Sequence, residues 1–258
     1  MTTPLSSIGF TLYTPEESWQ LATVVAEKGR RVSTADGNYV VLTTECGSEL
    51  WAKLDGENRP YAIVPHFAGQ AKSQLLVTQR IRYNDRPLDG RFLGWINPSQ
   101  GTFGFGGPPG DYPLLFEAPD YAFYTFMEVP CTVTVQLAAF AQNIDIFPSV
   151  DVYDSRPEKT WPAETLLASG MAGLHGYQRG DHSPHANEAF ITGIVETTRT
   201  FENPLTHGYF QWGRVKVMGG YFDVCVDSSL LEGPLAAGQV ISGNFWLSGR
   251  LVFDQQPN

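Results

Sequence analysis

Residues Tyr209–Asp227 read YFQWGRVKVMGGYFDVCVD and belong to the most clearly patterned part of the chain. In the second half of this stretch an apolar residue stands at every other position, beginning at Phe222 and ending at Val226. Alternation with a period of two is typical of a half-buried β-strand. Gly219 and Gly220 separate the two halves and have the backbone freedom that a tight hairpin turn needs. The stretch therefore predicts an antiparallel β-hairpin.

Strand patterns continue on both sides of this hairpin. Phe190–Phe201 precedes it as a long strand, and Gln239–Leu247 and Gly249–Phe253 follow it as a final strand pair. Glycines lie inside these strands, where they permit bulges and tight bends. A long first strand, a meander and two closing strands resemble the small five-stranded barrel of the OB-fold. This resemblance implies an OB-like β-barrel at residues 187–258.

The first half of the chain predicts strands as well. One hairpin is expected from Tyr39–Thr44 and Glu49–Leu54, and another from Leu75–Tyr83 and Gly90–Ile96. The chain contains 16 Phe, 11 Tyr and 6 Trp, together with 26 Gly and 18 Pro. This composition is typical of short aromatic strands separated by frequent turns. The predicted fold class is mostly β, with two small β-barrel or sandwich-like units and one N-terminal helix.

The helix is expected shortly after the N-terminus. Thr14 is a favourable N-cap residue, Pro15 suits the first helical position, and Glu17 stands where a capping box requires it. An apolar stripe that begins at Leu21 follows, and Gly29 is placed to end the helix. Such a helix is expected to cover an open barrel end or the face of a sheet.

The division into domains rests on residues 151–186. This segment is the least regular part of the chain, with several prolines, scattered charges and glycines. Its length and composition are typical of a linker or an elaborated connection between domains. We therefore expect an N-terminal α+β or β domain at 1–150, an irregular connection at 151–186 and the OB-like barrel at 187–258.

The net charge and the cysteine content indicate which kinds of partner and which cellular compartment the sequence favours. The net charge of −10 and the pI of about 4.9 disfavour nucleic acid and anionic membrane surfaces, and favour a basic partner. No stretch approaches the ~20 apolar residues of a membrane helix, and Met1–Phe10 contains no secretory signal. Cys46, Cys131 and Cys225 are odd in number and far apart, which disfavours a disulfide framework. These observations favour a cytoplasmic protein.

The sequence contains no recognisable catalytic signature, such as a nucleophile elbow, a zinc-protease helix or a phosphate loop. We therefore expect no catalytic residue and no cofactor. The one metal-like cluster is His175, His182 and His185, whose imidazoles suit zinc or another transition metal. The alternative is a polar surface loop, because nothing in the sequence fixes ligand geometry. His66 lies in an apolar patch, and we expect a hydrogen-bonded structural histidine there.

A candidate ligand-binding face combines aromatic and basic side chains of the C-terminal strands. Its members are Trp212, Arg214, Lys216, Tyr221 and Trp246. In OB-like barrels the corresponding face binds ligands, and such side chains suit stacking on bases or sugars. Asp223, on the adjacent strand, would neutralise the positive charge of this face. The alternative is therefore ordinary cross-strand pairing of charges beside a packed tryptophan.

Taken together, the sequence favours a non-enzymatic binding protein, an acidic β scaffold that recognises a protein partner. An immunity- or inhibitor-type role against a basic protein fits the charge, and abundant aromatic residues suit interface anchors. Two alternatives stay open: a small-molecule-binding β-barrel with an aromatic-lined interior, and a metal-dependent enzyme that uses the His175/His182/His185 cluster. The fold alone does not rank these functions. The identity of the partner and the oligomeric state are left open by the sequence.

Overall fold

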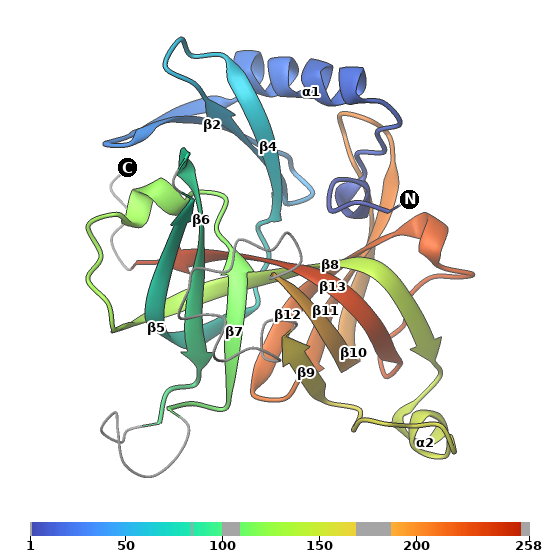
Figure 1. The fold of residues 1–258 in the computed structure, drawn as a ribbon. Coiled ribbons are helices and arrows are strands. Elements are labelled where there is room, and N and C mark those ends of the chain that lie inside the picture. The colour runs from blue at the N-terminus through green and yellow to red at the C-terminus, as the bar shows by residue number, and fades with distance from the viewer. Residues whose placement is uncertain (1, 84, 100–108, 169–186, 254–258) are drawn as a thin grey trace.

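The computed structural model describes residues 2–83, 85–99, 109–168 and 187–253 (Figure 1). The strands are β1 (Arg30–Thr34), β2 (Gly37–Thr43), β3 (Ser48–Leu54), β4 (Pro60–Phe67), β5 (Lys72–Tyr83), β6 (Arg86–Ile96), β7 (Tyr112–Glu117), β8 (Cys131–Phe147), β9 (Thr165–Ala168), β10 (Glu188–Glu202), β11 (Tyr209–Val217), β12 (Gly220–Asp227) and β13 (Val240–Val252). The helical segments are η1 (Ser6–Ile8), α1 (Pro15–Lys28), η2 (Tyr121–Tyr124), α2 (Val150–Asp154) and η5 (Ser228–Leu230). The prediction of a mostly β protein is confirmed.

The described strands form two sheets. The small sheet has the order β1-β2-β3-β4, and all its neighbours are antiparallel. The large sheet has the order β11-β12-β8-β5-β6-β7-β13-β10-β9. Its neighbours are antiparallel except for β12–β8 and β7–β13, which run parallel. Figure 1 shows the small sheet and α1 stacked on one side of the long strands β8 and β13.

Strands β8 and β13 are not neighbours in this order, but they also pair with each other and so join two distant positions of the large sheet. They pair antiparallel from Thr134↔Val252 to Phe147↔Val240. Because β10 also pairs with β11, the ladders return to their start along β10, β11, β12, β8 and β13. The C-terminal strands therefore pair around β8, a strand that lies outside residues 187–258 and within the predicted N-terminal domain at 1–150. Whether this circuit is an OB-like barrel, and whether residues 187–258 form a domain of their own, stay predictions.

The predicted hairpins are present, with a shift at one turn. β2–β3, β5–β6 and β11–β12 are antiparallel neighbours. Val217 pairs with Gly220, so the turn between β11 and β12 consists of Met218 and Gly219 instead of the two glycines. Gly219 has a φ of +77°, in the left-handed region that glycine adopts without a steric cost.

The predicted final strand pair is wrong, because residues 240–252 form one continuous strand, β13. Gly249 does not begin a new strand: it continues the ladder with β8 and lies opposite Leu137. A Cβ atom at this position would lie 2.6 Å from the ring of Phe116. The glycine is therefore explained by close packing, a reason that the sequence pattern does not distinguish from a turn.

Helix α1 has the predicted boundaries and covers one face of the small sheet. The hydroxyl of Thr14 accepts a hydrogen bond from the backbone N–H of Glu17, and the Glu17 side chain accepts one from the backbone N–H of Thr14. Ala22 and Val25 are buried, and the helix packs against β2, β3 and β4. None of the helices in the described ranges has the length and hydropathy needed to cross a bilayer.

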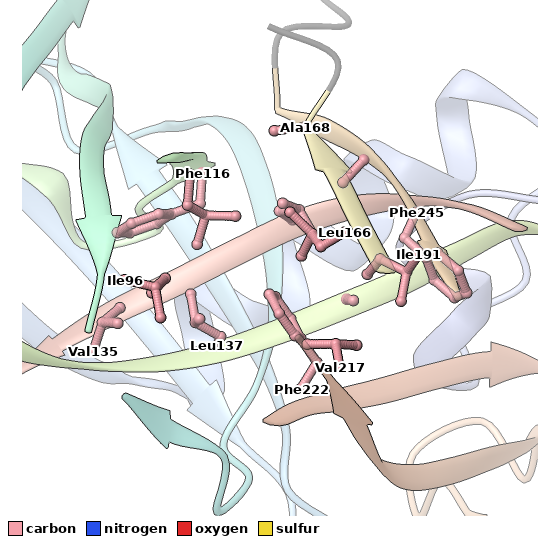
Figure 2. Close-up of a cluster of buried hydrophobic side chains, with 14 of the residues drawn as sticks. Ile96, Phe116, Val135, Leu137, Leu166, Ala168, Ile191, Val217, Phe222 and Phe245 are labelled. Carbon is pink, nitrogen blue, oxygen red and sulfur yellow. The ribbon is translucent and has the colours of Figure 1, made fainter. Parts of the chain in front are cut away.

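The large sheet encloses a closely packed apolar core. Figure 2 shows part of it, with side chains from β6 to β13 pointing toward one another. Phe92 is fully buried, and its ring centroid lies 5.9 Å from that of Phe116 and 5.3 Å from that of Tyr121. These distances are typical of aromatic pairs in direct contact. Side chains of the protein itself thus fill this region.

Strand β3 is buried along its whole length because both faces of the small sheet are covered. Leu50 and Ala52 face α1 and pack in one cluster with Val25. Trp51 faces the other way and packs with Leu88 of β6. Since side chains alternate along a strand, Glu49 and Lys53, two positions before and after Trp51, share its face and enter the space between the sheets.

Candidate binding groove

Three members of the predicted ligand-binding face hold acidic partners within the protein. The Arg214 guanidinium carbon lies 4.2 Å from the Tyr221 ring centroid, and Arg214 Nε lies 3.8 Å from a carboxylate oxygen of Glu196. The Tyr221 hydroxyl donates to Glu196 at 2.8 Å, and Lys216 Nζ donates to Glu164 at 3.0 Å. These hydrogen bonds raise the pKa of Tyr221 and of Lys216. The basic groups are therefore already neutralised by neighbours.

The two tryptophans of the predicted face are half-buried and belong to the core that surrounds Phe67. Trp212 Nε1 donates to Asp223 Oδ1 at 3.0 Å, and its ring stacks on Phe67 with centroids 6.3 Å apart. Trp246 packs against the same cluster. These contacts agree with the alternative interpretation of this face, in which charges pair across strands beside a packed tryptophan. A role of this face in ligand binding stays a prediction.

The predicted metal ligands His175, His182 and His185 lie outside the described residues. Within the described residues, no group of three or more His, Cys, Asp and Glu side chains is placed to hold a metal ion. Metal binding by the histidine cluster therefore stays a prediction.

His66 is a structural histidine, as predicted. It is fully buried, its Nε2 lies 2.6 Å from Oε1 of Gln136, and its Nδ1 lies 2.9 Å from Oγ of Ser248. Burial lowers the pKa of His66 to about 3, and the positive charge of Arg250 contributes to this shift. The imidazole is therefore neutral at physiological pH and holds β4 to β8 and β13.

The same network continues to Asp223, a carboxylate with no solvent exposure. Its Oδ2 accepts hydrogen bonds from the backbone N–H of Ala71 at 2.7 Å and from Nε2 of Gln136 at 3.1 Å. Its Oδ1 accepts the indole N–H of Trp212. A Cβ atom at residue 69 would lie 2.1 Å from Asp223, so Gly69 is needed for this approach. Three donors stabilise the buried carboxylate, whose role is to fix the connection between β4 and β5.

A layer of charged side chains lies between the two sheets. Lys53 of β3 is fully buried; its ammonium group contacts Asp89 of β6 and lies 3.8 Å from Glu117 of β7. The hydroxyl of Tyr61 also donates to Asp89, at 3.3 Å. Buried charges of this kind are tolerated because each is paired. They tie the small sheet to the large one.

A second part of this layer surrounds Arg250 of β13. Its Nε lies 2.9 Å from Asp120 Oδ2, and its Nη1 lies 3.3 Å from Glu49 Oε2. The guanidinium carbon lies 4.8 Å from the Trp51 ring centroid, and Trp51 Nε1 donates to Glu49 at 2.9 Å. These contacts occupy the charged groups with one another. They account for the buried Glu49 and the partly buried Arg250 as elements of sheet-on-sheet packing.

An open groove lies outside the core, where the N-terminal segment, α1 and β4 meet. Its volume is about 590 Å³, and it is lined by uncharged residues: Thr3, Leu5, Leu12, Tyr13, Thr14, Pro15, Ser18, Trp19, Ala22, Tyr61, Ala62 and Ile63. Two aromatic side chains project from it into solvent, since Tyr13 is 84% and Trp19 is 57% exposed. Ligand-binding pockets have volumes of ~300–1,000 Å³ and mostly apolar walls. The groove meets both conditions.

Figure 1 shows the chain that leads from η1 to the first turn of α1, and residues of this chain, of α1 and of β4 line the groove. The capping box of Thr14 and Glu17 fixes the direction in which the chain enters the helix. That entry places Tyr13 and Trp19 on the same rim. Because α1 is anchored on the small sheet by Ala22 and Val25, the rim is held by regular structure.

A second cavity, of about 700 Å³, lies beside β8 and carries charged walls. Asp145, Glu158 and Glu232 contribute carboxylates to it. These carboxylates would attract a cation, and the protein itself supplies one, the guanidinium group of Arg156. Arg156 donates a hydrogen bond to Glu158 at 2.8 Å, and its guanidinium carbon lies 4.1 Å from the Phe147 ring centroid. We therefore regard the groove at α1 as the better candidate site.

The groove is not among the sites that the sequence pattern predicts. The signal was the position of Trp19, which falls outside the apolar stripe that begins at Leu21 and includes Val25. An exposed tryptophan on an amphipathic helix is informative only when a neighbouring wall is known, and β4 is distant in sequence. Comparison with protein-family models, with curated proteins and with solved structures finds no match for the chain.

Proposed function

We propose that the protein is a non-enzymatic binding protein that receives a segment of a protein partner in the groove between the N-terminal segment, α1 and β4. The observation that carries the proposal is the exposure of Tyr13 and Trp19 on the rim of an apolar groove. Aromatic side chains that are solvated in the free protein and close to an apolar hollow are typical anchors of protein interfaces. Their burial by a partner supplies the driving force for binding.

The proposal follows from the shape and the chemistry of the groove. Its walls contain no charged side chain, so a ligand gains from burial of apolar surface and from a few hydroxyl and backbone groups. The interior of the large sheet supports a small-molecule carrier less well, because rings such as Phe92 and Phe116 already pack against each other there. The net charge of −10 favours a basic partner and increases its rate of association.

The test uses the full-length protein with a photo-crosslinking amino acid in place of Ser18, which lines the groove. We expect one protein of a native lysate to be crosslinked, and the crosslink to be lost in the Tyr13→Ala/Trp19→Ala double variant. Trp161→Ala is the matched control, because Trp161 is also exposed, by 40%, but lies elsewhere. Equal crosslinking in the double variant and the control would reject the groove as the binding site.

The metal-dependent enzyme remains a separate proposal that depends on His175, His182 and His185. Metal analysis of the purified protein tests it directly. A stoichiometric transition metal that is lost in the His182→Ala variant would favour the enzyme over the binding protein.

A further inference from the structure

The groove lies beside a free edge of the small sheet. β4 is the last strand of the order β1-β2-β3-β4, and within the described residues it pairs with β3 alone. The backbone N–H and C=O groups on its other side therefore have no strand partner in the part of the chain that the structure describes. Unpaired edges of this kind accept an additional strand readily.

The lining of the groove indicates that it runs along this edge. Tyr61, Ala62 and Ile63 are consecutive residues of β4, and all three line the groove. Tyr61 is the extra residue of a bulge, because Lys53 pairs with Ala62 and Leu54 with Pro60. Ala62 and Ile63 continue the regular ladder, so their side chains point to opposite faces of the sheet. A hollow that touches both Ala62 and Ile63 therefore adjoins the backbone edge, not one face of the sheet. All three residues are only partly buried.

Two prolines limit the length of edge that can pair. Pro60 and Pro65 have no backbone N–H to donate, and they flank the segment from Tyr61 to Val64. This segment keeps its backbone donors. Prolines next to an edge are a common protection against unlimited strand addition, so the free length here suits a short segment and not a second sheet.

The charge at the head of the groove is negative. Glu16 and Glu17 lie in the first turn of α1, between the lining residues Pro15 and Ser18. Glu17 accepts hydrogen bonds from the backbone N–H groups of Tyr13 and Thr14, at 2.5 and 3.2 Å. Glu16 is exposed and makes no ion pair with any described residue. A lysine or arginine of a partner therefore complements this end of the groove.

We propose that the occupant of the groove is an extended segment of a protein partner that pairs with the edge of β4 as an additional strand. The segment places alternate apolar side chains beside Tyr13 and Trp19 and a basic side chain near Glu16. This inference rests on the proposed function, which names the groove but not the conformation of its occupant. Backbone hydrogen bonds along an edge supply affinity in this mode, and the side-chain sites supply specificity.

The test selects short peptides from a random displayed library on the full-length protein, with the Tyr13→Ala/Trp19→Ala variant as the counter-selection. The enriched peptides are synthesised unmodified and with N-methyl groups at either of the two alternate sets of backbone nitrogens. We expect N-methylation of one set to weaken binding by at least about tenfold and of the other set to have little effect, because only one set faces β4. Glu16→Gln is expected to weaken binding about fivefold, and only for peptides with a basic residue.

Two outcomes separate the inference from the function on which it rests. If the selected peptides depend on Tyr13 and Trp19 but tolerate N-methylation of both sets, the occupant is not paired with β4, and this inference is overturned while the groove remains a binding site. If no enriched peptide depends on these two aromatic residues, the proposed function fails together with the inference.

Discussion

Lys53 is a fully buried cation whose ammonium group contacts Asp89 and lies 3.8 Å from Glu117. Replacement by methionine keeps the length of the side chain but leaves the two carboxylates without their partner. We expect Lys53→Met to lower the free energy of unfolding by ~3–5 kcal/mol, which is the usual result of breaking a buried ion pair from one side. Urea denaturation measures the change.

The control for this prediction is Arg59→Met. Arg59 lies 3.0 Å from Asp55 and 3.0 Å from Glu57, but its side chain is 68% exposed. An exposed ion pair contributes ~0–1 kcal/mol, so the control should be almost as stable as the wild type. Similar losses in both variants would show that the inter-sheet charges have no special role.

His66 makes the stability of the protein depend on pH. Its folded-state pKa of about 3 is lower than the value of 6.5 that applies to an unperturbed imidazole. The unfolded chain therefore binds the proton first, and the contribution of the neutral imidazole is complete above pH 6.5 and is lost as the pH falls from 6.5 toward 3. Stability should decrease by up to ~1.4 kcal/mol per pH unit in this window from His66 alone.

The measurement is the free energy of unfolding between pH 7 and pH 5, where most carboxylates stay ionised. His66→Gln keeps hydrogen-bonding groups but does not titrate, so its stability should vary less with pH than that of the wild type, even if it is lower throughout. His207→Gln is the control, since that imidazole is 80% exposed. An unchanged pH dependence in His66→Gln would contradict the assignment of the acid sensitivity to His66.

At the scale of single elements, α1 depends on its N-cap. The Thr14 hydroxyl accepts the backbone N–H of Glu17 at 3.2 Å, and this bond satisfies one of the free donors of the first turn. Thr14→Ala should lower the free energy of unfolding by ~1 kcal/mol, whereas Thr14→Ser should retain most of the stability. Chemical denaturation of both variants measures the difference. Equal stability of the alanine and serine variants would argue against the cap.

For the whole molecule, β8 connects the two halves of the chain. It pairs with β13 along the whole of that strand and with β12 from Asp223 to Cys225. A fragment of residues 187–258 lacks β8, so β12 and β13 would each expose an unpaired edge and the apolar face that they bury. We expect this fragment not to fold cooperatively, as measured by circular dichroism and by the dispersion of its amide proton spectrum. A dispersed spectrum and a sharp unfolding transition would instead support the predicted C-terminal domain.

The sequence predicts local structure correctly where residues close together in the chain determine that structure. The capping box of α1 and the alternation in Tyr209–Asp227 depend on residues a few positions apart, and the structure confirms both elements. The structural role of His66 was predictable from its apolar surroundings. The single strand at 240–252 was not, because Gly249 and a turn glycine look alike until Phe116 is placed beside it.

The candidate groove was beyond prediction from the sequence, because its walls come from segments about 40 residues apart. Tyr13 and Trp19 are informative only once β4 lies next to them. In the same way Lys53 reads as an ordinary polar position of a half-exposed strand, and only the covering of both faces of the small sheet explains its burial. The helix, the hairpins and the acidic charge can be read from the amino-acid sequence, because they arise from local backbone preferences and composition. The free strand edges, the buried charges and the position of the aromatic rim require the folded chain, because they follow from contacts between distant segments.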